Sequence, residues 1–227
     1  MVKSVITKYN DTVEEVQNLI KFLLKYNNMY SLSVAPGESS IYKPFTYKSN
    51  KENLYAIEKF IKEFNHPKVT MQSYMIPIGN LPFEEKMKRH NERATCSGNI
   101  TFFYVLPDGI VTLCEQIYWH PFFILGDLSK QSIMEVWNSE KALSLWNIKQ
   151  SEIKKESPCS NCKIFEKCRH GQGSCWRMAI QAYGLDNYDF PYPQCPFAPE
   201  VKSDFYIDKT ATAEYIMGLL KKSVDLF

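Results

Sequence analysis

Seven cysteines are the residues of this chain whose type and spacing can do chemistry. Twelve residues separate Cys96 from Gly109, and four more separate Gly109 from Cys114. A second run has gaps of two, five, six and nineteen residues between its members, which are Cys159, Cys162, Cys168, Cys175 and Cys195. Thiolates two residues apart can bind one metal centre from a single turn, and a distant cysteine can complete that centre. All-thiolate ligation favours zinc or an iron–sulfur cluster.

Charge and hydropathy restrict the setting in which this chemistry occurs. The 227 residues carry 27 basic and 25 acidic side chains, a formal charge of +2, so neither nucleic acid nor a membrane surface is indicated as a partner. No apolar run approaches the roughly 18 residues of a membrane span, and Met1 to Thr12 lacks the apolar stretch of a signal peptide. We therefore expect a cytoplasmic chain, in which an odd number of thiols favours metal binding over disulfides.

The first 95 residues contain no cysteine and show alternating strand and helix patterns. The predicted order is strand 2–7, helix 11–26, strand 30–34, loop 35–49, helix 51–64 and strand 69–75. Asp11, with Glu14 three positions later, is the expected start of the first helix. This order is typical of parallel βα units, in which the sheet is buried on both faces.

The elements that must position the cysteines follow. A charged, exposed helix is expected over 83–93, leading into Cys96, and a hairpin over 101–115 is expected to turn at Pro107-Asp108-Gly109 and to carry Cys114 on its second strand. Ser129 or Ser132 is the expected cap of one helix over 133–146. After residue 156 the composition predicts loops that fold around a metal.

The order of the cysteines resembles the SPASM domain of radical SAM enzymes such as anaerobic sulfatase maturases. The resemblance covers residues 96–199 and uses all seven cysteines. It extends to three further stretches, namely Gly126-Asp127-Leu128, Glu135-Val136-Trp137 and Tyr192-Pro193-Gln194-Cys195-Pro196. One departure is the gap between the fifth and sixth cysteines, where the family usually has three residues and this chain has six.

The resemblance implies two [4Fe-4S] clusters with interleaved ligands. Cys159, Cys162, Cys168 and Cys195 would hold one cluster with all four irons ligated. The second cluster would have one open iron, and its ligands would be Cys96, Cys114 and Cys175. In the family, such clusters are thought to relay electrons to or from the radical site, or to bind substrate.

The catalytic motif of radical SAM enzymes is absent from this sequence. That chemistry needs three cysteines at spacings of three and two residues, and no such triplet occurs here. We therefore expect no cleavage of S-adenosylmethionine by this chain alone, which is either a fragment, a split reading frame or a stand-alone cluster carrier. A missing segment or another chain would carry the catalytic cluster and bind S-adenosylmethionine.

Other residues near the cysteines allow both a functional and a plainer interpretation. His170 or His120 could ligate the open iron, but each can equally be an ordinary loop or core histidine. Glu115, beside Cys114, is a candidate base or ligand. The basic residues near the predicted clusters either form solvated surface, offset the cluster charge or face a partner; they are Lys154, Lys155, Lys163, Lys167, Arg169 and Arg177.

Taken together, the sequence predicts an α+β protein. Residues 1–80 resemble the last βα units of a partial radical SAM barrel, 81–95 a connecting helix, 96–199 the SPASM domain and 200–227 a helical tail. The favoured function is the auxiliary-cluster part of a radical SAM enzyme that modifies a peptide or protein. The alternatives are a stand-alone iron–sulfur electron carrier or binding module, and a zinc-stabilised interaction domain.

Overall fold

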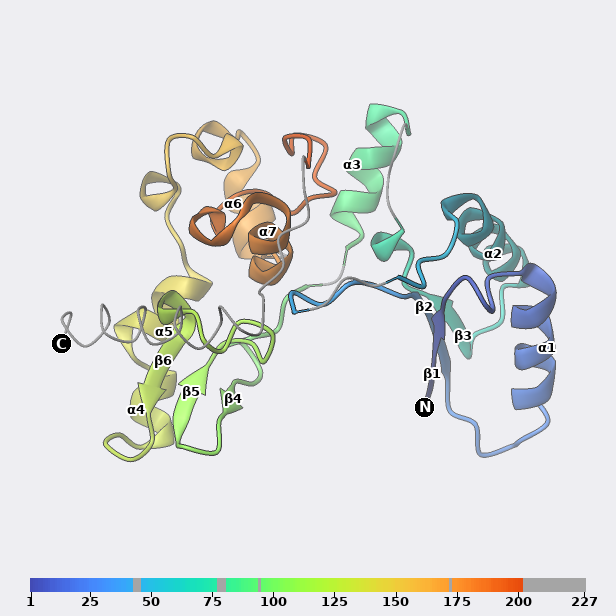
Figure 1. Cartoon of the computed structure of the whole chain (residues 1–227), viewed down its shortest axis with the longest axis horizontal. Coiled ribbons are helices and arrows are strands. Elements are labelled where there is room, and N and C mark those ends of the chain that lie inside the picture. The colour runs from blue at the N-terminus through green and yellow to red at the C-terminus, as the bar shows by residue number, and fades with distance from the viewer. Residues whose placement is uncertain (43–45, 77–80, 94, 172, 202–227) are drawn as a thin grey trace. The chain divides into compact units, whose positions relative to one another are not determined.

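A computed structural model describes residues 1–42, 46–76, 81–93, 95–171 and 173–201 (Figure 1). The described chain divides into two units. The first unit comprises residues 1–40 and the described residues from 46 to 93, and the second comprises residues 41 and 42 with the described residues from 95 to 201. Each unit combines helices with a small sheet, which confirms the expected α+β class.

Three parallel strands form the sheet of the first unit. They are β1 (Val2–Ile6), β2 (Leu32–Pro36) and β3 (Val69–Met71), in the order β1-β2-β3. Val2 pairs with Leu32, and Leu32 pairs with Val69. β3 is shorter than expected, because residues 73–75 form a 3-10 turn, η1 (Ser73–Met75).

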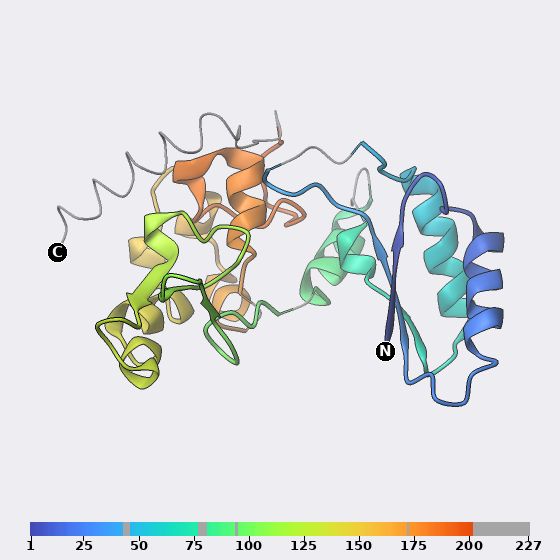
Figure 2. The same cartoon turned by 60° about the horizontal axis from the view of Figure 1, so that its bottom comes forward.

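Two helices connect these strands and lie side by side on one face of the sheet (Figures 1 and 2). In α1 (Val13–Leu23) the N-cap is Thr12 and not Asp11, because the Thr12 side chain accepts the hydrogen bond of the Glu15 amide. α2 (Lys51–Phe64) has the predicted bounds, since Asn50 caps its start and Asn65, at φ 46°, adopts the left-handed conformation that ends it.

The core of the first unit is aliphatic. It includes Ile6, Val16, Ile20, Leu32, Val34, Leu54, Ile57, Ile61, Val69 and Ile76. The expected burial of both faces of the sheet is not observed throughout, because Val5 of β1 is 53% exposed within the described chain. Phe64, the last residue of α2, is 40% exposed.

A buried ion pair joins α3 (Phe83–Asn91) to α2. The Nη2 atom of Arg89 lies 2.7 Å from Oε2 of Glu58, and these side chains are 9% and 5% exposed. Burial favours a higher pKa for Glu58, but hydrogen bonds from Lys62 and Arg89 outweigh it and leave that pKa below its usual value. The prediction that this helix is an exposed one was therefore wrong for Arg89 and His90, both of which are buried.

The second unit contains the predicted hairpin and one strand more. β4 (Tyr104–Val105) pairs antiparallel with β5 (Ile110–Thr112), and Gly109 turns the chain at φ 88°. The third strand, β6 (Ile124–Asp127), pairs with β5 through an irregular register at Val111 and Thr112. The sequence had predicted that Cys114 lies on the second strand of the hairpin. β5 ends at Thr112, however, so Cys114 follows the strand.

Two short helices replace the single helix predicted over 133–146. α4 (Ile133–Trp137) begins at a capping box formed by Ser132 and Glu135. α5 (Glu140–Trp146) has its own cap, Ser139, whose side chain accepts the Ala142 amide hydrogen bond. The helical hydrogen bonding stops at Asn138. The buried residues of the two short helices are Val136, Ala142 and Leu145.

Residues after 156 are more helical than predicted. α6 (Phe165–Gly171) and α7 (Trp176–Tyr183) stand among short 3-10 turns. The 3-10 turns of the second unit are η2 (Pro121–Phe123) and η3 (Gln150–Glu152) before residue 156, and η4 (Pro158–Asn161) and η5 (Leu185–Asn187) after it. Nearly all of the predicted helical tail, residues 202–227, lies outside the described residues.

The core of the second unit includes aromatic residues from three segments. Trp119, Phe123, Phe165 and Trp176 are buried in it together with Ile41. Tyr118, which begins the same aromatic run, is 38% exposed. Within the described ranges, no helix is both long and apolar enough to cross a bilayer.

Candidate metal centre

All seven cysteines lie in the second unit, with free and half-buried thiols. Cys96 precedes a tight turn, Cys114 follows β5, and Cys175 is the residue before α7. The other four come from η4 and its end, from α6, and from the turn near residue 195. Short helices and turns thus position the candidate ligands.

Cys96, Cys114 and Cys175 lie within electrostatic range of one another. The pKa of the Cys114 thiol is raised to about 12, mainly by burial and also by Glu115 and the thiols of Cys175 and Cys96. The pKa of Cys96 is raised by burial and by Cys175. The thiol of Cys175 therefore acts electrostatically on both Cys96 and Cys114.

Cys195 is grouped with the other run of thiols. Burial raises its pKa to about 12, with further contributions from Cys168, Cys159 and Cys162. The Cys195 thiol therefore lies near three cysteines that are 27 to 36 residues earlier in the sequence. These electrostatic interactions relate the thiols in two sets, one of three members and one of four. We call them the three-thiol site and the four-thiol site.

Backbone amides support one or more thiols in each site. The sulfur atoms of Cys96, Cys114 and Cys195 interact with the backbone amide two residues further along, and each interaction lowers the thiol pKa. Such N–H groups stabilise a thiolate, which is the form that binds metal. A coordinated metal would supply the remaining stabilisation that these buried thiols lack.

Two side chains, Gln150 and Arg169, donate hydrogen bonds to cysteines of the four-thiol site. Gln150 donates from Nε2 to the carbonyl oxygens of Cys159 and Cys162, at 2.9 and 3.0 Å. Arg169 donates from Nη2 to Sγ of Cys159, at 3.3 Å. The same nitrogen donates to the carbonyl oxygens of Asp189 and Phe190, at 2.7 and 3.1 Å, so the guanidinium ties α6 to the segment that leads to Cys195.

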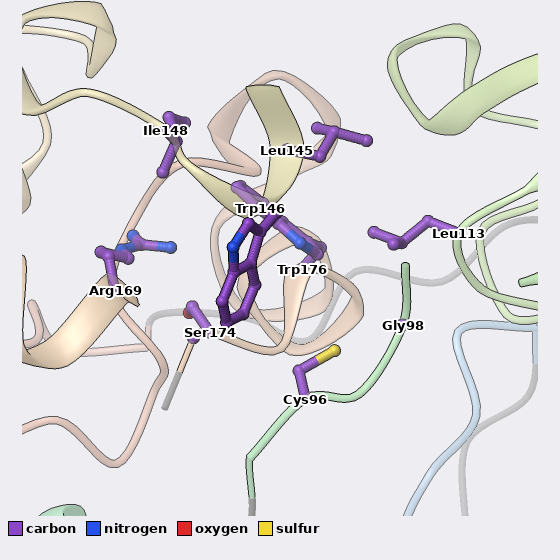
Figure 3. Close-up of a pocket in the computed structure, with 10 residues that line it drawn as sticks. Cys96, Gly98, Leu113, Leu145, Trp146, Ile148, Arg169, Ser174 and Trp176 are labelled. Carbon is purple, nitrogen blue, oxygen red and sulfur yellow. The ribbon is translucent and has the colours of Figure 1, made fainter. Parts of the chain in front are cut away.

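A small pocket lies beside the three-thiol site (Figure 3). Its volume is about 30 Å³, and its lining includes Cys96, Arg169 and Ser174. In Figure 3, Arg169 lies on one side of the pocket and Cys96 on the other. Nη1 of Arg169 and Oγ of Ser174 are buried and have no hydrogen-bond partner among the described residues.

These unpartnered donors test whether an iron–sulfur cluster suits the site. A buried donor without an acceptor costs about 1–3 kcal/mol, so native proteins rarely contain one. The sulfur atoms of a cluster at the three-thiol site are acceptors of the kind that Arg169 and Ser174 lack. The free thiols and the unpartnered donors both fit such a cluster.

No three side chains of His, Cys, Asp or Glu gather tightly enough to hold a single metal ion in the part of the chain that the structure describes. The two thiol sites are therefore recognised by the mutual electrostatic effects of their sulfur atoms.

The candidate histidines have other partners. Nδ1 of His170 lies 2.7 Å from Oε2 of Glu166, and Nε2 lies 3.1 Å from the carbonyl oxygen of Ile148. His120 is buried, and Nδ1 accepts the amide hydrogen bond of Phe122. Burial lowers its pKa, which favours the neutral ring of a core histidine. Both observations support the plainer interpretation.

Glu115 lies close to the three-thiol site. Sγ of Cys114 is 3.9 Å from Oε2 of Glu115. A hydrogen bond to Glu115 is the main reason that the pKa of Tyr104 is raised to about 12. Glu115 is exposed, so it can also exchange contacts with solvent.

Sequence reasoning missed the roles of Gln150 and of the backbone at 189–190. It named Arg169 only as one of six basic residues. Gln150 carried no signal, because its contacts depend on the fold of η3 against η4. The position of Arg169 next to Cys168 was the only available signal.

Comparisons with known proteins agree with the thiol-bearing region. Residues 96–163 match the family model SPASM, described as an iron-sulfur cluster-binding domain. No curated protein matches the chain. A similar solved structure is titled "Native anSMEcpe with bound AdoMet and Cp18Cys peptide", with a TM-score of 0.44 and 15% sequence identity. The match covers 99% of this chain but only 56% of that one. The family model therefore supports the expected resemblance over residues 96–163, which include Cys96, Cys114, Cys159 and Cys162.

Proposed function

We propose that this chain, whose residues 96–163 match a SPASM iron–sulfur cluster-binding domain, binds two [4Fe-4S] clusters as an auxiliary part of a radical SAM enzyme that modifies a peptide or protein. Cys159, Cys162, Cys168 and Cys195 hold one cluster. Cys96, Cys114 and Cys175 hold the other and leave one iron open. When bound, such clusters accept and release single electrons.

One observation carries the proposal of two clusters. The thiols that interact with one another form a group of three and a group of four. These groups combine cysteines that are far apart in the sequence. A single zinc site would need only four thiols, so it would leave three buried sulfur atoms without a role.

The chain's own residues prepare these sites. Gln150 fixes the turn that presents Cys159 and Cys162 by binding both of their carbonyl oxygens. Trp176 stands next to Cys175 and packs at 5.5 Å from Phe123, between ring centroids. Aromatic packing of this kind limits the access of water to one side of the three-thiol site, which influences the potential of a bound cluster.

The catalytic part of the proposed enzyme is supplied by a segment or chain that carries the missing cysteine triplet. S-adenosylmethionine binds there, a peptide or protein is the substrate, and the compartment is the cytoplasm. The radical SAM context of the SPASM family supports this part of the proposal, together with the βα pattern of the first unit.

The first test is the content of iron and acid-labile sulfide after reconstitution without oxygen. We expect about eight irons per chain in the wild type, because two four-iron clusters are proposed. The double variant with Cys159→Ala and Cys162→Ala should retain about four, and so should the matched variant with Cys96→Ala and Cys114→Ala. Zinc without labile sulfide would contradict the proposal and leave a structural metal module.

A stand-alone electron carrier is the second candidate, favoured by the lack of the catalytic triplet in this sequence. The two candidates predict the same iron content but different partners. Addition of a chain that contains the triplet should yield cleavage of S-adenosylmethionine that depends on this chain's clusters only if the enzyme proposal is correct.

A further inference from the structure

Arg169 contacts a sulfur atom of the four-thiol site and also lines the pocket beside Cys96. It is 4% exposed and lies in α6, directly after Cys168. The guanidinium carbon lies 5.6 Å from the centre of the Trp176 ring. The residue is thus held by polar contacts on one side and by an aromatic ring on another.

The charge of Arg169 is not compensated by a carboxylate among the described residues. Its Nη2 atom donates to one sulfur and to two backbone carbonyls, all of which lack a full negative charge in the thiol form. Its Nη1 atom has no partner within the described ranges. Because an unpaired buried charge is strongly unfavourable, such a guanidinium needs anionic groups nearby.

We propose that Arg169 links the two cluster sites electrostatically. Its Nη2 atom donates to a sulfur atom of the four-thiol site, and its Nη1 atom would donate to a cluster at the three-thiol site. This inference rests on the proposed function. Each cluster becomes more negative by one charge when it gains an electron, so a fixed positive charge nearby favours the reduced form. Hydrogen bonds to the sulfur atoms act in the same direction. Arg169 therefore raises the reduction potential of both clusters, and its effect is larger at the four-thiol site, where it contacts a sulfur.

The test is a redox titration of the reconstituted full chain, with dithionite as the one-electron reductant and electron paramagnetic resonance as the readout. In Arg169→Gln, the ratio of reduced to oxidised cluster at a fixed potential should fall about tenfold for the four-thiol site, which equals about 59 mV for a one-electron couple. The cluster at the three-thiol site should shift in the same direction by less.

Lys167→Gln is the matched control, because it removes the same charge two residues away from an exposed position on α6. Solvent screens such a charge, so its removal should leave both titrations unchanged. An equal shift in both variants would show that only net charge matters, and this would overturn the proposal.

Iron content distinguishes a failure of the proposed function from a failure of the inference about Arg169. If the wild type binds no iron, the proposed function fails and this inference fails with it. If Arg169→Gln binds as much iron as the wild type and titrates identically, only the inference about Arg169 fails.

Two measurements remain decisive if Arg169→Gln does not fold. Arg169→Lys keeps the positive charge, so both clusters should stay within about 59 mV of their wild-type potentials, a tenfold change in the ratio of reduced to oxidised cluster. Larger shifts at both clusters would contradict a link through charge. In the wild type with guanidino-¹⁵N arginine, pulsed resonance should detect nitrogen coupling to both reduced clusters. Coupling to neither would overturn the proposal without any variant.

Discussion

The two units of this chain are stabilised in different ways. The first has a parallel sheet, two amphipathic helices and an aliphatic core, with one buried ion pair at α3. The second has a small antiparallel sheet and short helices, and its core is surrounded by half-buried thiols and unpartnered donors. Apolar burial accounts for the first unit. The second also needs groups that satisfy its sulfur and nitrogen atoms.

Removal of the metal should give the largest contrast between the units. Metal binding in small metal domains is worth on the order of 10 kcal/mol, and that energy is also folding energy. We expect hydrogen exchange in residues 157–171 and 189–196 to accelerate at least about a hundredfold in the apo protein. Exchange in β1, β2 and α2 should stay the same. Equal acceleration in both units would contradict the distinction between them.

Arg89→Met should destabilise the first unit alone. The substitution leaves Glu58 buried with only Lys62 as its charged partner, and breaking a buried pair in this way costs about 3–5 kcal/mol. Denaturant unfolding, monitored by exchange in α2, measures the loss. Lys59→Met is the control, since the Lys59–Glu63 pair is exposed and should contribute at most about 1 kcal/mol. A change in iron content would show that the units are not independent.

Gly126→Ala tests packing in the second unit. A Cβ atom at this position would lie 2.7 Å from Cγ2 of Val136 and 2.8 Å from Oε1 of Gln131. We expect a destabilisation of about 1–3 kcal/mol, caused by overpacking of β6 against α4. Gly171→Ala is the control, because nothing lies within 4 Å of its added Cβ. Thermal unfolding of the holo protein should distinguish the two variants.

Acid should weaken the first unit by the smallest amount among these effects. The pKa of Glu58 is below its usual value, so its contribution to stability is present above the ordinary pKa of glutamate and is lost as the pH falls through the folded value. Exchange in α2 at successively lower pH measures this loss. Glu58→Gln should remove this part of the pH dependence; an unchanged profile would assign it to other groups.

Periodicity predicted the first unit well for a physical reason. α2 has its predicted bounds because a capping asparagine and a left-handed asparagine mark its two ends in the sequence itself. In the second unit, Ser139 is also a cap, but its signal was hidden within a continuous apolar pattern that favoured one long helix. β6 was missed because Ile124 to Asp127 shows no alternation that distinguishes a strand.

The resemblance implied a ligand set, but the surroundings of the thiols could not be predicted from the sequence. Cysteine spacing states which thiols are close in sequence, but the contact of Arg169 with the carbonyl oxygens of Asp189 and Phe190 spans 20 and 21 residues. The helices α6 and α7 were masked by a composition typical of loops. Such contacts depend on the tertiary fold, which brings distant segments of the chain together. Local sequence patterns do not specify it.

Tyr42 has a consequence for the timing of folding during synthesis. Its hydroxyl group donates to the carbonyl oxygen of Gln116 and accepts from Nε1 of Trp119, which is 77 residues later in the chain. At ribosomal rates of about 5–20 residues per second, Trp119 is synthesised on the order of 4 to 15 s after Tyr42. The nascent chain must therefore keep Ile41 and Tyr42 out of wrong contacts for seconds, an interval in which a chaperone can act.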